Sequence, residues 1–295
     1  MGMTINTNVG AMAALQTLNA TSKQLQTTQA RINTGLNVAS TKDDSSTYVI
    51  AQKLRGDVSD MKAVTNSLNN GKSVLDVAVS GAEQINEILS TMATKAKEAA
   101  DPSKSKDDRD ILDKDFQKYK ETIKTIIDSA EFNGTNLLKK AGGDVSALTS
   151  IRSSDATAFV PQTIKVTNQG LEVAATTATA TGAIKFSDET KLVDSSTVGA
   201  TNSNATEAVK LVADTQQAFK AVLGDLGAAA RQIETQLTFV SKLSDTVTSG
   251  IGNLVDADMA KESANIQALQ VKQQLGVQAL GIANQTPQTI LSLFK

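Results

Sequence analysis

Apolar side chains recur at alternating steps of three and four residues along most of the chain. The first series consists of Leu54, Met61, Val64, Leu68, Leu75, Ala78, Ala82, Ile85, Leu89, Met92 and Ala96. This spacing is typical of a coiled-coil seam, in which one stripe of a helix faces its partners. It predicts a helix from about residue 44 to residue 99, roughly 80 Å long at about 1.5 Å per residue. Asp101-Pro102 ends this helix, because proline disfavours helical backbone at the residue before it.

Two more seams follow. The second runs through Leu112, Phe116, Tyr119, Ile123, Ile126 and Ala130, and the turn-prone pair Asn133-Gly134 closes it. The third consists of Val212, Phe219, Leu223, Leu226, Ala230, Ile233, Leu237, Val240, Val247, Ile251 and Leu254. Three such helices bury their stripes together in an antiparallel bundle.

Residues 144–205 lose the helical period and become rich in Ser, Thr, Ala and Gly. Apolar residues alternate with polar ones in three pairs: Ile164 with Val166, Leu171 with Val173, and Ile184 with Phe186. This alternation predicts short strands on a half-buried surface. The tract containing Thr176, Thr177, Thr179 and Thr181 is interpreted as an exposed loop or edge strand, and a weaker alternative is a site for O-linked sugar.

Both ends of the chain have helical periodicity but almost no charge. Residues 3–41 contain only Lys23 and Arg31 as charged residues, and residues 263–294 contain only Lys272. A surface helix normally carries Glu, Lys and Arg on its polar side. Here Gln, Asn, Ser and Thr take those places, and such residues can be buried when they find hydrogen-bond partners. We therefore expect both ends to be covered.

A helical wheel places apolar residues on two faces of each end. At the N-terminus, Leu15, Leu18, Leu25, Ile32 and Leu36 form one stripe, and Ile5, Val9 and Met12 begin another. In the last helix, Ile266, Leu269, Val277 and Leu280 lie on one side, and Val271, Leu275 and Ile282 lie nearly opposite. A pair of helices uses one stripe of each, so the second stripes indicate contact with a different molecule. We expect the ends to be disordered or frayed in the monomer and to fold when the chain self-assembles. The alternative is that both ends dock on the bundle of the same chain.

The composition excludes most enzyme classes. The chain has no Cys and no His, which removes thiol nucleophiles, Ser-His-Asp triads and thiolate or imidazole metal sites. The acidic cluster Asp107, Asp108, Asp110, Asp113 and Asp115 alternates with basic residues at a helix start, where acids complement the helix dipole. Asp256 and Asp258 lie between two helices and are interpreted as caps. We expect no catalytic site, no metal and no cofactor.

Charge and hydropathy limit the partners. The formal net charge is -2, whereas binding to nucleic acid needs a basic face. No stretch of about 18 apolar residues predicts a membrane span, and the N-terminus lacks the pattern of a cleaved signal peptide. The sequence therefore predicts neither nucleic-acid binding nor membrane insertion.

Several segments carry a family resemblance. They are Ile5-Asn6-Thr7-Asn8, Ala30-Arg31-Ile32-Asn33-Thr34-Gly35-Leu36, Ser40-Thr41-Lys42-Asp43-Asp44, Glu131-Phe132-Asn133-Gly134-Thr135, Asp256-Ala257-Asp258, Ala283-Asn284-Gln285-Thr286-Pro287-Gln288 and Leu291-Ser292-Leu293-Phe294. In this order they resemble the N- and C-terminal regions of bacterial flagellin, and the resemblance covers both helical arms. A hook-filament junction protein or another secreted helical assembly component is the alternative.

The resemblance implies a mainly α fold: an elongated antiparallel coiled-coil bundle with a small β-rich tip, and N- and C-terminal helices paired at one end. Residues 1–45 with 256–295 would line the inner tube of a filament, residues 46–143 with 206–255 would form the coiled-coil core, and residues 144–205 would be the exposed variable region. The expected self-assembly interface consists of Ile5, Val9, Leu15, Leu18, Leu25, Ile32, Leu36, Ile266, Leu269, Val271, Leu275, Val277, Leu280, Ile282, Leu291 and Phe294.

The resemblance also implies partners and a location. The partners would be other copies of the chain, the flagellar type III export apparatus, an export chaperone for the C-terminal helix, and the filament cap and hook-associated proteins. The chain would be secreted and extracellular, in the flagellar filament.

Overall fold

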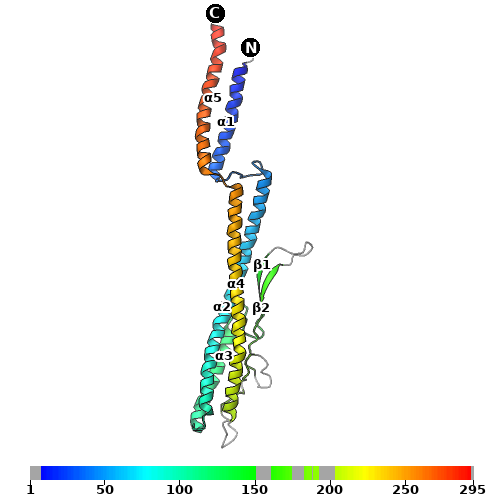
Figure 1. Cartoon of the computed structure of the whole chain (residues 1–295), viewed down its shortest axis with the longest axis vertical. Coiled ribbons are helices and arrows are strands. Elements are labelled where there is room, and N and C mark those ends of the chain that lie inside the picture. Colours follow the sequence, from blue (N-terminus) through cyan, green and yellow to red (C-terminus); the bar gives the residue numbers. More distant parts are fainter. Residues whose placement is uncertain (1–7, 151–160, 175–182, 188, 193–202, 294–295) are drawn as a thin grey trace. The chain divides into compact units, whose positions relative to one another are not determined.

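The computed structural model describes residues 8–150, 161–174, 183–187, 189–192 and 203–293, with side chains up to residue 285. In these ranges it contains five helices and one small sheet (Figure 1). The helices are α1 (Val9–Thr34), α2 (Ser45–Ala100), α3 (Lys106–Ser129), α4 (Ser203–Val255) and α5 (Met259–Leu293), and the strands are β1 (Val145–Ser150) and β2 (Gln162–Val166). The prediction of a mainly α fold is confirmed.

The chain divides into two compact units. The first unit comprises Met1–Val58 and Ser244–Lys295, and the second comprises Ser59–Leu243. Each unit has a hydrophobic cluster of its own. The boundaries of these units differ from the three-part division expected from the sequence, which stays a prediction.

The core of the second unit is built from the three predicted seams. Figure 1 shows α2, α3 and α4 side by side in this unit. From Val64 to Ala96, every member of the first seam is buried. Phe116 of α3 and Phe219 of α4 are fully buried in the same cluster. Burial of these stripes stabilises long helices that would be marginal alone in water.

The ends of α3 agree with the sequence signals. Ser105 caps the helix through its hydroxyl, which accepts a hydrogen bond from Asp108 N, and the Asp108 carboxylate accepts one from Ser105 N. After α3, Asn133 and Gly134 both have positive φ, of 51° and 79°. Phe132 and Thr135 exchange two backbone hydrogen bonds around this pair. The predicted turn is therefore confirmed.

The region after this turn is only partly as expected. β1 pairs with β2 in antiparallel fashion, with Val145 opposite Val166 and an irregularity between Leu148 and Ser150. The strand predicted around Ile164 and Val166 is thus confirmed as β2. The strands predicted around Leu171 with Val173, and around Ile184 with Phe186, are wrong: these segments form only isolated bridges, although all four side chains are buried.

Side chains of α3 hold the Ile184 segment in place of a strand partner. The buried Lys120 donates from Nζ to Ser187 O and Thr190 O, both at 2.8 Å. Asp113 Oδ1 accepts from Leu192 N at 2.6 Å. A buried ammonium needs such acceptors, because it would otherwise lose its hydration without compensation. The tract Thr176, Thr177, Thr179 and Thr181 lies outside the described residues.

In the first unit, the connection from α1 to α2 pairs with the connection from α4 to α5. Val255 O accepts from Asn37 N at 2.7 Å, and Gly35 O accepts from Ala257 N at 2.9 Å. Beside them, Val38, Ala51, Ile251 and Val255 form a small buried cluster. Within residues 35–44, the hydroxyl and N–H of Ser40 bind Asp43 and hold the pKa of its carboxyl below the usual value.

Replacement of Gly35 by Ala is expected to destabilise the first unit by about 1 kcal/mol, because Gly35 ends α1 with a φ of 70° that L side chains adopt at a cost. An added Cβ would meet nothing within 4 Å, so backbone strain is the whole effect. Urea unfolding followed by circular dichroism measures it. Gly56→Ala is the matched control: it lies inside α2 in open space, and it should stabilise the chain by up to about 1 kcal/mol. Equal changes in the free energy of unfolding for Gly35→Ala and Gly56→Ala would contradict the conclusion that the positive φ of Gly35 requires glycine.

Candidate assembly interface

Helices α1 and α5 lie side by side in the first unit (Figure 1). On α1, two positions beside the contact, Ser22 and Arg31, are partly buried. The buried or partly buried residues that form the contact itself are Ala11, Ala14, Leu18, Thr21, Leu25, Thr28 and Ile32 of α1, and Glu262, Ile266, Leu269, Gln273, Gly276, Leu280 and Ala283 of α5. Both sets follow alternating steps of three and four residues. This is the seam of a two-helix coiled coil.

Three places define how the two helices meet. At one end, Asn8 caps α1 and donates from Nδ2 to Ala283 O at 2.8 Å. In the middle, α5 passes close to α1 at Gly276, where an added Cβ would lie 3.2 Å from Leu18 Cδ1. At the other end, Arg31 Nη1 lies 3.3 Å from Glu262 Oε1. The pairing of the N- and C-terminal helices expected from the sequence is confirmed.

The seam contains buried polar residues, as the charge-poor composition predicted. Thr21 is buried, and its hydroxyl donates to Thr17 O at 2.9 Å. Thr28 and Glu262 are buried as well. A hydroxyl that bonds to its own helix enters such a seam at little cost, because its donor stays satisfied.

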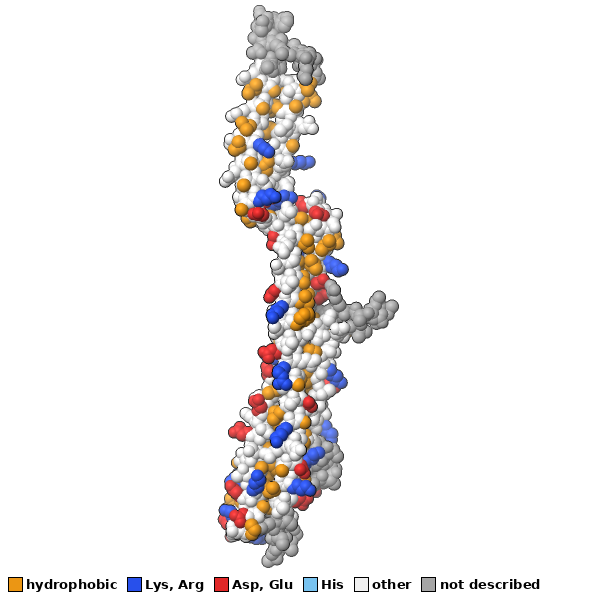
Figure 2. Space-filling model, viewed as in Figure 1, with side chains coloured by type: hydrophobic (Ala, Val, Ile, Leu, Met, Phe, Trp, Pro, Cys, Tyr) orange, Lys and Arg blue, Asp and Glu red, His pale blue; other side chains and the backbone are white. Residues whose placement is uncertain are grey.

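Outside the seam, both helices expose large apolar side chains. On α1 these are Val9, Met12 and Leu15, and on α5 they are Val271, Leu275, Val277 and Ile282. Val9 is 73% exposed and Leu275 is 58% exposed. Figure 2 shows hydrophobic side chains distributed over this pair with few charged ones among them. We call these seven residues the terminal apolar surface.

Two residues that the helical wheel groups with seam residues are exposed. Leu15 shares a stripe with Leu18, and Val277 shares one with Leu280, whereas Leu15 and Val277 are 50% and 57% exposed. Both directly follow a seam residue, Ala14 and Gly276, and so flank the seam. A two-helix seam is narrower than the apolar face of a bundle helix, so flanking positions stay open to solvent.

The remaining predicted interface residues have varied surroundings. Leu18, Leu25, Ile32, Ile266 and Leu280 are partly buried in the seam, and Leu269 is buried. Leu36 lies in the connection, where it pairs with Asp256. Ile5 and Phe294 lie outside the described residues, and Leu291 belongs to α5 without a described side chain. The interface as a whole stays a prediction.

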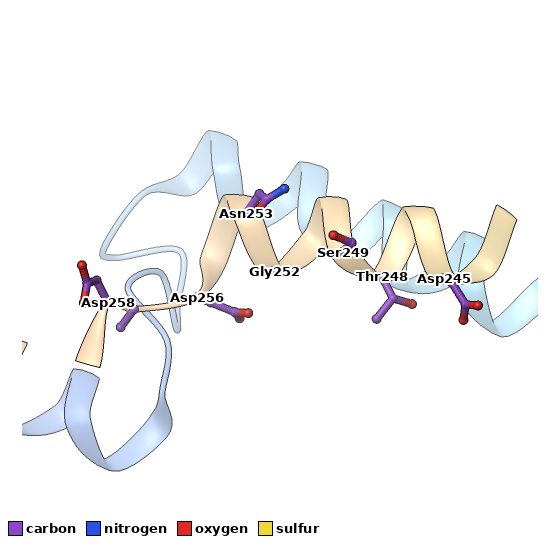
Figure 3. Close-up of a pocket in the computed structure, with 8 residues that line it drawn as sticks. Asp245, Thr248, Ser249, Gly252, Asn253, Asp256 and Asp258 are labelled. Carbon is purple, nitrogen blue, oxygen red and sulfur yellow. The ribbon is translucent and has the colours of Figure 1, made fainter. Parts of the chain in front are cut away.

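A shallow acidic depression lies on the last turns of α4 and the connection that follows. Its lining includes Asp245, Thr248, Ser249, Gly252, Asn253, Asp256, Ala257 and Asp258. Figure 3 shows Asp245, Thr248 and Asp256 on one side of the α4 ribbon, and Asn253 on the other. Asp258 instead caps α5, since its Oδ1 accepts from Ala260 N and Lys261 N. Among the described side chains, no group of three or more acidic residues is placed to hold a metal ion.

None of the helices within the described residues contains a stretch with the length and hydropathy of a membrane span. The expectation that Asp256 and Asp258 act as caps is confirmed for Asp258. Asp107 and Asp108 lie in the first turn of α3, as expected for acids that complement a helix dipole.

Comparison with known families identifies both helical arms. Residues 5–142 match the bacterial flagellin N-terminal helical region, and residues 209–294 match the bacterial flagellin C-terminal helical region. The chain belongs to the bacterial flagellin family. Flagellins are structural subunits of the flagellar filament and not enzymes, and this chain is such a subunit.

Named flagellins match this flagellin over nearly its whole length. Flagellin FljK of Caulobacter vibrioides is 40% identical over 99% of this chain and 98% of its own. A flagellin of Brucella melitensis is 35% identical over 99% of both chains. Among solved structures, a putative flagellar hook-associated protein from Vibrio parahaemolyticus covers 72% of this chain and 100% of its own, with 13% identity and a TM-score of 0.55. That last likeness shows a shared fold alone.

Proposed function

We propose that the terminal apolar surface joins copies of this flagellin in the filament. The proposal rests on the observation that both terminal helices expose large apolar side chains outside the seam that they form with each other. Contiguous exposed apolar surface on a soluble chain marks an interaction site. Its scarcity of Lys, Arg, Asp and Glu fits the core of a protein interface, from which charged residues are depleted.

In this proposal, residues 1–45 with 256–295 form the innermost layer of the filament. Residues 46–143 with 206–255 form the coiled-coil layer around it, and residues 144–205 form the outer variable region. The predicted interface also includes the seam residues, because each helix must first bury one stripe against its partner. The ends of a free subunit would gain order on assembly, since isolated helices are marginal in water.

The family supports further partners. The flagellin would be secreted through the flagellar type III export apparatus, with a chaperone covering its C-terminal helix, and it would meet filament cap and hook-associated proteins outside the cell. The absence of Cys from the chain suits passage as an unfolded polypeptide, because no disulfide has to be broken first. A role as hook-filament junction protein is the alternative, and no feature of the described residues favours it.

Seeded elongation tests the proposed surface. Concentrated wild-type subunits should elongate filament fragments. The double substitution Val271→Glu with Leu275→Glu should slow elongation by at least about tenfold, because each subunit contact would then bury unpaired carboxylates. Both positions are exposed in the single chain, so urea unfolding of the monomer should change little. The volume-conserving control Val271→Ile with Leu275→Met should elongate seeds like the wild type. Normal elongation by the Glu variant would exclude this surface.

A further inference from the structure

Methionine is the only sulfur-containing residue of this flagellin, because the chain has no Cys. Four of its six Met have described side chains, and their exposure differs widely. Met92 is fully buried in the core of the second unit, and Met61 is partly buried against the same core. Met12 is 65% exposed and Met259 is 44% exposed. Among these four, a soluble oxidant therefore reaches Met12 and Met259 first, since oxidation of Met needs access to its sulfur.

Met12 belongs to the terminal apolar surface, whereas Met259 does not. Met12 lies one helical turn from Val9 and from Leu15, and all three side chains are exposed. They border a shallow hollow on α1 whose described lining includes no charged residue. This lining consists of Val9, Met12, Ala13, Leu15, Gln16 and Asn19. The thioether of Met12 thus lies in an uncharged part of the surface that the proposed contact would cover.

A hydroperoxide oxidises a thioether by transfer of one oxygen atom. The sulfur attacks the distal peroxide oxygen, so that an S–O bond forms and the O–O bond breaks. The sulfur gives up two electrons, and hydrogen peroxide is reduced to water. The product is methionine sulfoxide, a polar side chain with a hydrogen-bond acceptor. Water satisfies this acceptor in the free subunit, whereas burial against apolar side chains would leave it unpaired at a cost in free energy.

We infer that Met12 is an oxidation-sensitive switch in the terminal apolar surface. Its thioether form permits contact with the next copy of the chain, and its sulfoxide form opposes that contact. The inference rests on the proposed function, because the switch requires that Met12 become buried on assembly. It adds a regulator to that surface: a hydroperoxide acts on the free subunit, and the assembled filament shields the same sulfur.

Treatment of free subunits and of filaments with hydrogen peroxide, followed by peptide mass spectrometry, tests the access of the oxidant. In free subunits, Met12 should oxidise at least about tenfold faster than the buried Met92. In filaments, the rate at Met12 should fall by at least about tenfold, because the contact excludes the oxidant. A methionine-containing peptide added to both samples calibrates the oxidant. Equal rates at Met12 in subunits and filaments would contradict the inference.

Seeded elongation by oxidised subunits tests the switch itself. Each chain is compared with its own untreated sample, so a change in basal rate caused by a substitution does not enter. Peroxide should slow elongation by the unmodified chain at least about fivefold. It should slow Met12→Leu by less than about twofold, because Leu has no sulfur, although Met1, Met3 and Met259 remain. Met259→Leu, a matched substitution of an exposed Met outside the surface, should respond to peroxide like the unmodified chain.

Two further measurements separate oxidation of the surface from damage to the fold. The peroxide dose is chosen so that Met61 and Met92 stay reduced, and the midpoint of urea unfolding should then be the same before and after treatment. Incubation with both methionine sulfoxide reductases, one for each sulfoxide epimer, should restore elongation. Their thiol reductant meets no disulfide, because the chain has no Cys.

Three outcomes of the elongation assay would overturn the inference. They are normal elongation by chains with fully oxidised Met12, equal slowing of Met12→Leu and the unmodified chain, and a loss of elongation that the reductases do not reverse. The variant Val271→Glu with Leu275→Glu keeps the inference apart from the proposed function. If this variant fails while oxidised subunits elongate normally, the surface stands and the switch is wrong. If both elongate normally, the proposed surface is wrong as well.

Discussion

Removal of residues 1–45 and 256–295 is expected to abolish elongation of filament seeds while leaving a folded, soluble chain. The cluster of the second unit contains no residue from the removed segments: its buried members run from Val64 to Val240. The smaller cluster of the first unit loses Val38 but keeps Ala51, Ile251 and Val255. The truncated chain therefore retains most of its buried surface, whereas it loses the whole terminal apolar surface.

Circular dichroism and electron microscopy of the seeded reaction measure the two parts of this result. The truncated chain should keep a cooperative thermal transition, and the seeds should not lengthen. The informative comparison is a chain shortened only by residues 1–7, which retains α1 from its Asn8 cap onward. Native filaments assembled from the fully truncated chain would show that assembly does not need the terminal helices.

Phe116→Ala is expected to destabilise the second unit by about 3–5 kcal/mol. Phe116 is fully buried, and its ring meets that of Phe186 edge-on, with centroids 6.5 Å apart and planes at 62°. Truncation to Ala would leave a cavity between α3 and the segment that Lys120 holds. Guanidinium or urea unfolding gives the loss of free energy.

Phe239→Ala provides the matched control, because Phe239 is 57% exposed on α4 in the same unit. Its effect should stay within about 0.5 kcal/mol. A double-mutant cycle with Phe186→Leu should return a coupling of about 0.5–1.5 kcal/mol between the two rings. Similar costs for Phe116→Ala and Phe239→Ala would show that the core of this unit is not packed as described.

The long helices could be predicted from the sequence because each buries one continuous stripe. The predicted helix from about residue 44 to residue 99 is observed as α2, Ser45–Ala100. Its seam from Val64 onward is buried without exception. Local signals such as the proline after Asp101 and the Asn133-Gly134 turn act within a few residues, so they need no knowledge of the rest of the fold.

The strand predictions around Leu171 and Ile184 failed for a tertiary reason. The burial that the alternating pattern predicts is confirmed, since Leu171, Val173, Ile184 and Phe186 are all buried. Backbone hydrogen bonds, however, come from Leu138 and from the side chains of α3 instead of from neighbouring strands. A single sequence contains no signal for that choice, because the partners lie tens of residues away.

The sequence predicts the general character of the candidate assembly interface, but not the exact residues that form the seam. Scarcity of charge indicated covered ends, and the periodicity indicated two apolar faces. Which residues form the seam depended on details of packing: Gly276 admits Leu18, and the narrow seam leaves Leu15 and Val277 exposed. The Arg31–Glu262 pair joins residues 231 positions apart, and neither segment contains a local sequence signal that predicts the pair.

The pairing of α1 with α5 also determines when the first unit can fold. Asn8 and Ala283 are separated by 275 positions in the chain, yet one hydrogen bond joins them. Closure of so long a loop carries an entropy cost that later contacts must recover, and contacts between such distant segments slow folding. While the chain is synthesised from its N-terminus, α1 has no partner until α5 has emerged. The last residues to arrive therefore complete a structure that the first residues began.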